Sequence, residues 1–72
     1  MNKARRLKIK SAIERIQELL QDVLDEEQDA YDSMPENLQG SYRGEESEEA
    51  QANLEAAIEA LEEAISCLEE IV

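Results

Sequence analysis

The residues of this chain that could carry chemistry are carboxylates and a single cysteine. The sequence has 19 Asp and Glu, one Cys and no His. Without an imidazole there is no general base for a serine or cysteine nucleophile. Cys67 lies on the flank of an apolar stripe, where a buried structural thiol is expected, whereas exposure in a monomer would leave a reactive thiol. Metal sites in helical bundles need carboxylates that point inward, commonly joined by His. Glu27, which continues the seam of Ile13 and Leu20, is the one acid predicted to face the interior.

The only local hint of a metal site is the acidic run DEEQD at residues 25–29. It resembles the carboxylate pairs by which all-α nucleotide pyrophosphohydrolases hold Mg²⁺. The second half of the chain has no matching inward pair, and there is no glycine-rich phosphate loop. We therefore predict that the chain is not an enzyme, with no catalytic residues, metal or cofactor.

Length and charge narrow the classes of protein to which this chain could belong. The chain has 72 residues, a formal charge of -12 and a single Pro, so it is predicted to form one small unit. Net charge of this sign argues against direct binding to nucleic acid or anionic lipid. One Cys makes no internal disulfide. No apolar run approaches the ~20 residues that cross a bilayer, and charged residues interrupt every apolar stretch after the basic N-terminus. We expect a cytoplasmic protein.

The first half of the chain is predicted to be one helix over residues 2–32. Its large apolar residues follow each other at spacings of four and three, the pattern of one helix face: Ile9, Ile13, Ile16, Leu20 and Val23. Residues 33–43 are predicted to be a connector, because Pro35 disfavours helical geometry at Met34. Gly40 is expected to close the turn with a positive backbone angle, and Ser41 is the better N-cap candidate for the second helix.

The second helix is predicted over residues 44–71, with Gly44 as a weak point in its first turn. Its apolar residues nearly repeat every seven positions, which is typical of a coiled-coil-like seam. This predicted oligomer seam consists of Leu54, Ala57, Ile58, Leu61, Ala64, Ile65 and Leu68.

Two long helices joined by a short connector predict an all-α fold, an antiparallel two-helix hairpin spanning residues 1–72. The stripe on the second helix is wider than one partner helix covers, and chains this short rarely bury enough surface alone. We therefore expect a homodimer that forms a four-helix bundle. A monomeric hairpin is the main competitor, and association with a different protein comes third.

Charge is segregated along the chain. Residues 1–16 hold six cations and one acid, a local charge of +5, whereas the remainder holds 18 acids and Arg43, or -17. The hairpin brings the basic start beside Glu62, Glu63, Glu69 and Glu70, and mutual neutralisation is the expected role of these charges. The alternative is a basic end that touches RNA, DNA or an acidic protein.

The opposite end has no such compensation. We predict an interaction surface there, hereafter the acidic end, formed by Asp22, Asp25, Glu26, Asp29, Asp32, Tyr42, Arg43, Glu45, Glu48 and Glu49. In this hypothesis its carboxylates take the place of nucleic-acid phosphates in a basic groove on another protein. Contacts from residues that project at the connector are expected to add specificity: Tyr31, Leu38, Tyr42 and Arg43. An acidic surface that serves solubility alone is the competing interpretation.

A further indication comes from the stretch between Asp25 and Ile65, with DEEQDAYDSMPENLQGS, then Arg43 and Glu45, and NLEAAIEALEEAI. It resembles a group of small acidic proteins of phages, plasmids and other mobile elements of Gram-positive bacteria. The turn at residues 35–39 (PENLQ) is its most distinctive part. The resemblance implies a mobile-element accessory protein that blocks host defence, and it supplies no catalytic residues.

Two other functions stay open. In one, an oligomer sequesters a nucleotide signal, with phosphate contacts from Arg5, Arg6, Lys8 and Lys10. In the other, the chain is a purely structural helical oligomer. Calorimetry with a panel of nucleotides separates the first of these from a protein-binding module.

Overall fold

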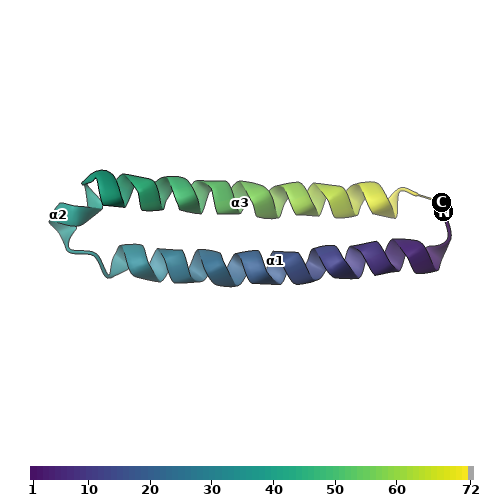
Figure 1. The fold of residues 1–72 in the computed structure, drawn as a ribbon. Coiled ribbons are helices and arrows are strands. Elements are labelled where there is room, and N and C mark those ends of the chain that lie inside the picture. The colour runs from purple at the N-terminus through teal and green to yellow at the C-terminus, as the bar shows by residue number, and fades with distance from the viewer. Residues whose placement is uncertain (72) are drawn as a thin grey trace.

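A computed structural model describes residues 1–71 of the chain. It consists of helix α1 (Lys3–Asp32), the short helix α2 (Glu36–Gln39) and helix α3 (Tyr42–Glu69). Helices α1 and α3 run antiparallel and pack along their length, and α2 caps one end of the pair, so the start of α1 and the end of α3 lie together at the other end (Figure 1). The Cα trace is 54 Å long and 15 by 11 Å across. The predicted all-α class and the two packed long helices are confirmed.

Helix α1 begins and ends where its sequence supplies the right groups. The Oδ1 atom of Asn2 accepts a hydrogen bond of 2.9 Å from the backbone N–H of Arg5, which satisfies one of the free donors of the first turn. At the other end, the N–H of Ser33 donates to the carbonyl of Asp29, and the N–H of Met34 donates to that of Tyr31. The helix stops there because the following Pro35 excludes helical geometry from Met34.

The connector is held by a side chain that no sequence pattern singles out. The amide nitrogen of Gln39 donates to the backbone carbonyls of Tyr31 (3.1 Å) and Met34 (3.3 Å), at the free C-terminal end of α1. The hydroxyl of Ser41, the N-cap of α3, donates to the carbonyl of Leu38. Gly40 has a φ of -86°, so the predicted positive backbone angle is wrong. The turn closes instead through these carbonyl contacts.

Gly44 has the opposite role from the one predicted. It is buried in the first turn of α3, and a Cβ atom added there would lie 1.8 Å from the carbonyl oxygen of Gln39. The absence of a side chain therefore allows the end of α2 to pack directly on the start of α3. The glycine that looked like a weak point in the helix is where the connector and helix α3 meet.

The two long helices contact each other in a constant register. Lys10 pairs with Glu69 and Tyr31 with Glu48, and in both contacts the two residue numbers add up to 79. Leu24 of α1 and Ser47 of α3 are each 4 % exposed. The rest of the interface is half-buried, and on α3 it includes the whole predicted oligomer seam: Leu54, Ala57, Ile58, Leu61, Ala64, Ile65 and Leu68.

The apolar face predicted for α1 is divided by the fold. Ile13 and Leu20 are half-buried against α3, whereas the other members of that stripe are exposed. Together with the exposed Ala12 and Leu19 they form a second row at spacings of three and four, hereafter the outer row: Ile9, Ala12, Ile16, Leu19 and Val23. A single partner helix covers only a narrow strip of its neighbour, so the outer row stays uncovered in the hairpin.

Candidate interaction surfaces

The acidic end forms where α1 finishes and α3 starts. All eight of its carboxylates are exposed: Asp22, Asp25, Glu26, Asp29, Asp32, Glu45, Glu48 and Glu49. Gln21 donates a 3.0 Å hydrogen bond to the carboxylate of Asp25. No carboxylate of this end takes part in an ion pair within residues 1–71. The fold thus brings acids from two distant segments together and leaves their charges unneutralised.

One contact ties the two helices together across this surface. The hydroxyl of Tyr31 donates a 2.7 Å hydrogen bond to a carboxylate oxygen of Glu48. This bond raises the pKa of Tyr31, with smaller contributions from burial and from the charges of Glu48 and Asp32. Because the neutral phenol is the donor, the bond fixes Glu48 in place without neutralising it.

The predicted specificity residues divide into two groups. Tyr42 is 75 % exposed at the start of α3, and Arg43 beside it is also exposed. Tyr31 and Leu38 are half-buried, because they cover the end of the hairpin core as well as facing outward. Tyr42 and Arg43 are therefore the side chains of this end with most surface to offer a partner.

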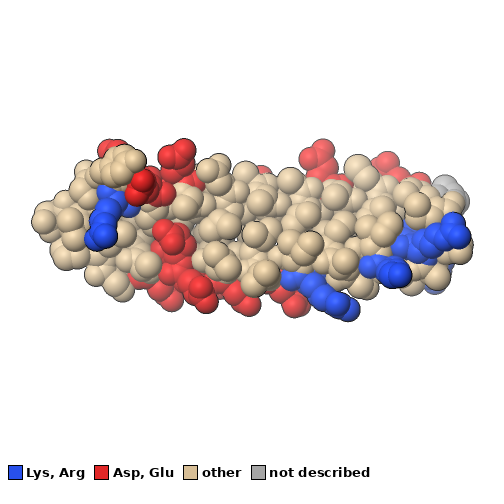
Figure 2. Space-filling view, viewed as in Figure 1, with Lys and Arg blue, Asp and Glu red and all other residues tan. Residues whose placement is uncertain are grey.

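The register of the hairpin shows how unequally charge is divided along its length. Residue 16 lies level with residue 63. The connector half, residues 17–62, holds 15 acids and Arg43, a charge of -14. The terminal half, residues 1–16 and 63–72, holds six cations and four acids, a charge of +2. Figure 2 shows the same division, with most cations near the termini and the acids densest toward the connector.

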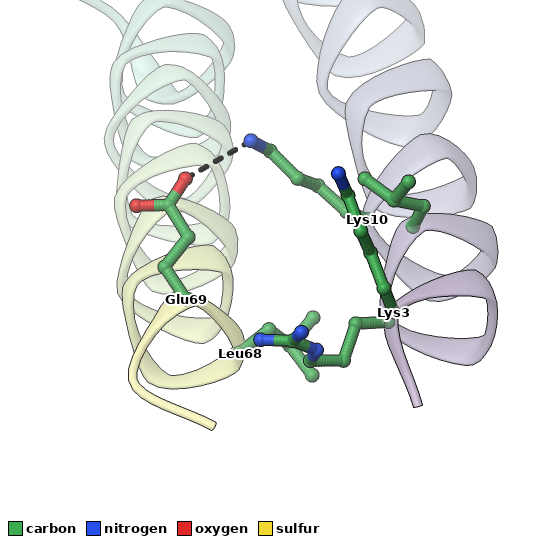
Figure 3. Close-up of a pocket in the computed structure, with 6 residues that line it drawn as sticks. Lys3, Lys10, Leu68 and Glu69 are labelled. Atoms are coloured by element: carbon green, nitrogen blue, oxygen red, sulfur yellow. Dashed lines mark ion pairs between the residues drawn. The ribbon is translucent and has the colours of Figure 1, made fainter. Parts of the chain in front are cut away.

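The terminal end contains a shallow groove of about 190 Å³ between the two long helices. Lys10 reaches across it from α1 to Glu69 of α3, with an Nζ to Oε1 distance of 3.0 Å, and Lys3 lies beside Lys10 (Figure 3). The hydrogen bond and the charge of Glu69 raise the pKa of Lys10. Arg6 also lines the groove, and its guanidinium donates to the carbonyl of Ile71.

These contacts test whether the cations of residues 1–16 are neutralised by α3 or are available to a ligand such as a nucleotide. The expected neutralisation by α3 takes the form of one ion pair within residues 1–71, the pair Lys10–Glu69. Two of the cations offered as phosphate ligands, Arg6 and Lys10, are already engaged, and the carboxylate of Glu69 lines the same groove. The carboxylate of Glu69 would repel a phosphate bound beside these cations. Arg5, Lys8 and Arg15 are exposed and make no ion pair in this part of the chain.

Glu27 is the one acid among residues 1–71 that is half-buried, as its place in the heptad pattern predicted. No group of three or more Cys, Asp and Glu side chains within residues 1–71 is arranged to hold a metal ion.

Cys67 is exposed in the single hairpin, which is the alternative expected for a monomer and not the buried thiol that was preferred. Neither long helix contains, in the part described, an apolar stretch sufficient to cross a bilayer.

The apolar residue missed at the level of sequence is Leu19, which is 62 % exposed and follows Ile16 in the outer row. Its signal was present in the sequence, since Ala12, Leu19 and Glu26 follow a seven-residue spacing of their own. Treating the apolar pattern of α1 as one stripe hides this second row.

No known protein family, curated protein or solved structure matches this chain.

Proposed function

We propose that this protein is an interaction module that binds a basic surface of another protein through its acidic end. The observation that carries the proposal is the concentration of a -14 charge in one half of a narrow rod, on carboxylates that have no cationic partner in residues 1–71. Carboxylates needed for helix pairing would be matched by cations on the neighbouring helix. These are instead presented to the solvent around one end.

The physical basis of binding is electrostatic. A single-sign surface of this kind accelerates encounter with a basic partner, and the affinity falls as salt screens the charges. Tyr42 and Arg43 supply directional contacts at the tip, since an exposed aromatic ring and a guanidinium are effective anchors. In the specific version of the proposal, the acids take the place of DNA phosphates, and the partner is a nucleic-acid-handling or defence protein of a host attacked by a phage or mobile element.

The proposal includes self-association into a homodimeric four-helix bundle. The support is the outer row of α1, which leaves large apolar side chains such as Leu19 in solvent along the middle of the hairpin. The half-buried seam of α3 contributes the flank next to it. A nucleotide-sequestering oligomer has less support, because Glu69 and Ile71 already occupy the cations of the terminal groove.

The experiment is capture of host proteins on the immobilised protein at low salt, followed by elution with rising salt and, separately, with duplex DNA. The test variant carries Asp29→Asn, Asp32→Asn, Glu45→Gln and Glu49→Gln. A matched control carries the same change in charge away from the acidic end, on the solvent side of α3 and its C-cap: Glu55→Gln, Glu59→Gln, Glu63→Gln and Glu70→Gln. We expect the test variant to lose the captured protein and the control to retain it.

Elution by duplex DNA would identify the captured surface as a nucleic-acid groove. Equal capture by the two variants would show that the acidic end is not the binding surface, and circular dichroism of both variants checks that the helices are intact.

A further inference from the structure

The outer row of α1 has a composition that fits a particular partner. Its two ends are continued, still at spacings of three and four, by Arg5 before Ile9 and by Glu26 after Val23. The row therefore has a cation at one end, an acid at the other and apolar side chains between them. From Ile9 to Val23 it is about 21 Å long, at 1.5 Å per residue.

From this pattern we infer that a second copy of the chain docks on the outer row, with the two α1 helices antiparallel and the two-fold axis at Ile16. This inference rests on the proposed dimer but not on the partner of the acidic end. It assigns the dimer contact to α1, with the seam of α3 as its flank.

The antiparallel orientation follows from the pairs that it creates. With the axis at Ile16, facing residues have numbers that add up to 31 or 32. Ile9 then faces Val23 of the second copy, and the small Ala12 faces the large Leu19. In a parallel pair Ala12 would face another Ala12, which leaves a gap, and Leu19 would face another Leu19. Large against small is the arrangement that fills an interface between helices.

Charge favours the same orientation. In the antiparallel pair Arg5 faces Glu26 of the second copy, at both ends of the interface because the contact is isologous. The parallel pair would oppose Arg5 to Arg5 and Glu26 to Glu26. Over the whole hairpin, the antiparallel arrangement lays the connector half, with its charge of -14, beside the terminal half of the other copy, with its charge of +2. The parallel arrangement would place the two connector halves side by side.

The charge gradient of α1 is costly unless something outside the helix uses it. Its first turn contains no acid and its last turn no base, so the cations lie at the positive end of the helix dipole and the acids at the negative end. Most of these charges also lack a partner on α3, since Lys10–Glu69 is the one ion pair within residues 1–71. Antiparallel pairing with a second α1 places the cations of each helix beside the acids of the other, which offsets this cost.

The other face of the hairpin does not offer a comparable surface. It contains a groove between the helices lined mainly by polar side chains: Glu14, Gln17, Glu18, Gln21, Ile58 and Glu62. At about 100° per residue, the outer row lies on the opposite flank of the Ile13 and Leu20 row from these residues. On α3 the same rotation places Ala57 and Ala64 on the flank away from Ile58, beside the outer row. The small alanines leave room for the second copy's α1 to approach.

Cross-linking tests the orientation directly. In a Cys67→Ser background, Ile9→Cys and Val23→Cys are prepared as separate proteins and treated with a short bis-maleimide, alone and mixed. We expect a cross-linked dimer from the mixture and little from either protein alone, because identical positions lie about 21 Å apart along the axis. Ile16→Cys, at the two-fold axis, is expected to cross-link to itself. Ala56→Cys, exposed on α3 outside the interface, is the control that is expected not to react.

Exchanging the charges of Arg5 and Glu26 tests the same antiparallel pairing through the dissociation equilibrium of the dimer. Arg5→Glu is expected to weaken the dimer on the order of tenfold at low salt, and Arg5→Glu with Glu26→Arg to restore it. Cross-linking of Ile9→Cys to itself, or no rescue by the double exchange, would overturn the antiparallel arrangement. A folded wild-type chain that remains monomeric in sedimentation equilibrium at high concentration would overturn the dimer itself, and neither result bears on capture by the acidic end.

Discussion

The connector end and the terminal end of this hairpin are built differently, although the same two helices form both. At the connector end the backbone of α3 touches that of α2 at Gly44, and Ser47 is buried in the next turn of α3. Leu24, further along the same half of the rod, is buried as well. At the terminal end Leu7 and Met1 are exposed, and the helices are joined by the pair Lys10–Glu69 and by Arg6. The well-packed end carries the unneutralised charge, whereas the loosely packed end carries compensating charges.

Packing and charge compensation act as alternatives in this small chain. Repulsion among the acids of the connector half opposes the approach of α1 and α3 there. The buried contacts of that end offset the repulsion, so the acids do not need cationic partners. The unpaired charge therefore lies in the half of the molecule that contains the buried contacts.

The largest effect on stability is expected from Leu24, the buried side chain of the connector half. Leu24→Ala is expected to lower the free energy of unfolding by about 3 kcal/mol, because it leaves a cavity in a fully covered position. Leu7→Ala, at the terminal end, where Leu7 is 49 % exposed, is expected to cost less than about 1 kcal/mol. Urea unfolding followed by circular dichroism measures both. Equal losses would remove the difference between the two ends.

A second effect concerns the close approach of the backbones. Gly44→Ala is expected to destabilise the chain by about 2 kcal/mol, because the new Cβ meets the carbonyl of Gln39 and the connector must shift. Gly40→Ala is the matched control, since nothing lies within 4 Å of a Cβ there and its φ suits alanine. The control is expected to be neutral or stabilising. Thermal unfolding of the two variants gives the comparison, and the reverse order of stability would contradict the role of Gly44.

The smallest effect is the pH dependence of the contact between Tyr31 and Glu48. Because the folded pKa of Tyr31 is raised above its usual value of 10.0, the contact stabilises the fold fully below pH 10.0. The contribution is lost as pH rises through the raised folded pKa. In a Tyr42→Phe background Tyr31 is the only phenol, so its absorbance titration reports this pKa directly. Adding Glu48→Gln is expected to lower it, and an unchanged titration would show that the hydrogen bond is not the cause.

The helical periods were sufficient to predict the two packed helices and the inward position of Glu27. Each depends on local spacing and on the restriction that Pro35 imposes. Ser41 does stand at the N-cap position of α3, but its side chain makes no capping hydrogen bond there and donates to Leu38 instead. The connector was less predictable, because the role of Gly44 depends on where Gln39 lies in space and not on its neighbours in sequence. The division of the α1 stripe was missed for a related reason. Periodicity shows which residues share a broad face, but the strip of that face covered by α3 depends on the packing of the two helices.

The acidic end was partly readable in the sequence, because a hairpin necessarily joins the last turns of its first helix to the first turns of its second. The bond from Tyr31 to Glu48 and the half-burial of Leu38 were not, since both depend on the register between the helices.

The capping of α1 by Gln39 has a consequence for recognition. Its side chain ties the connector to two carbonyls of α1, while Gly44 holds the connector against α3. Tyr42 and Arg43 therefore project from a segment whose conformational entropy has already been lost on folding. A partner that binds this tip does not have to order it, so more of the contact energy is kept as affinity.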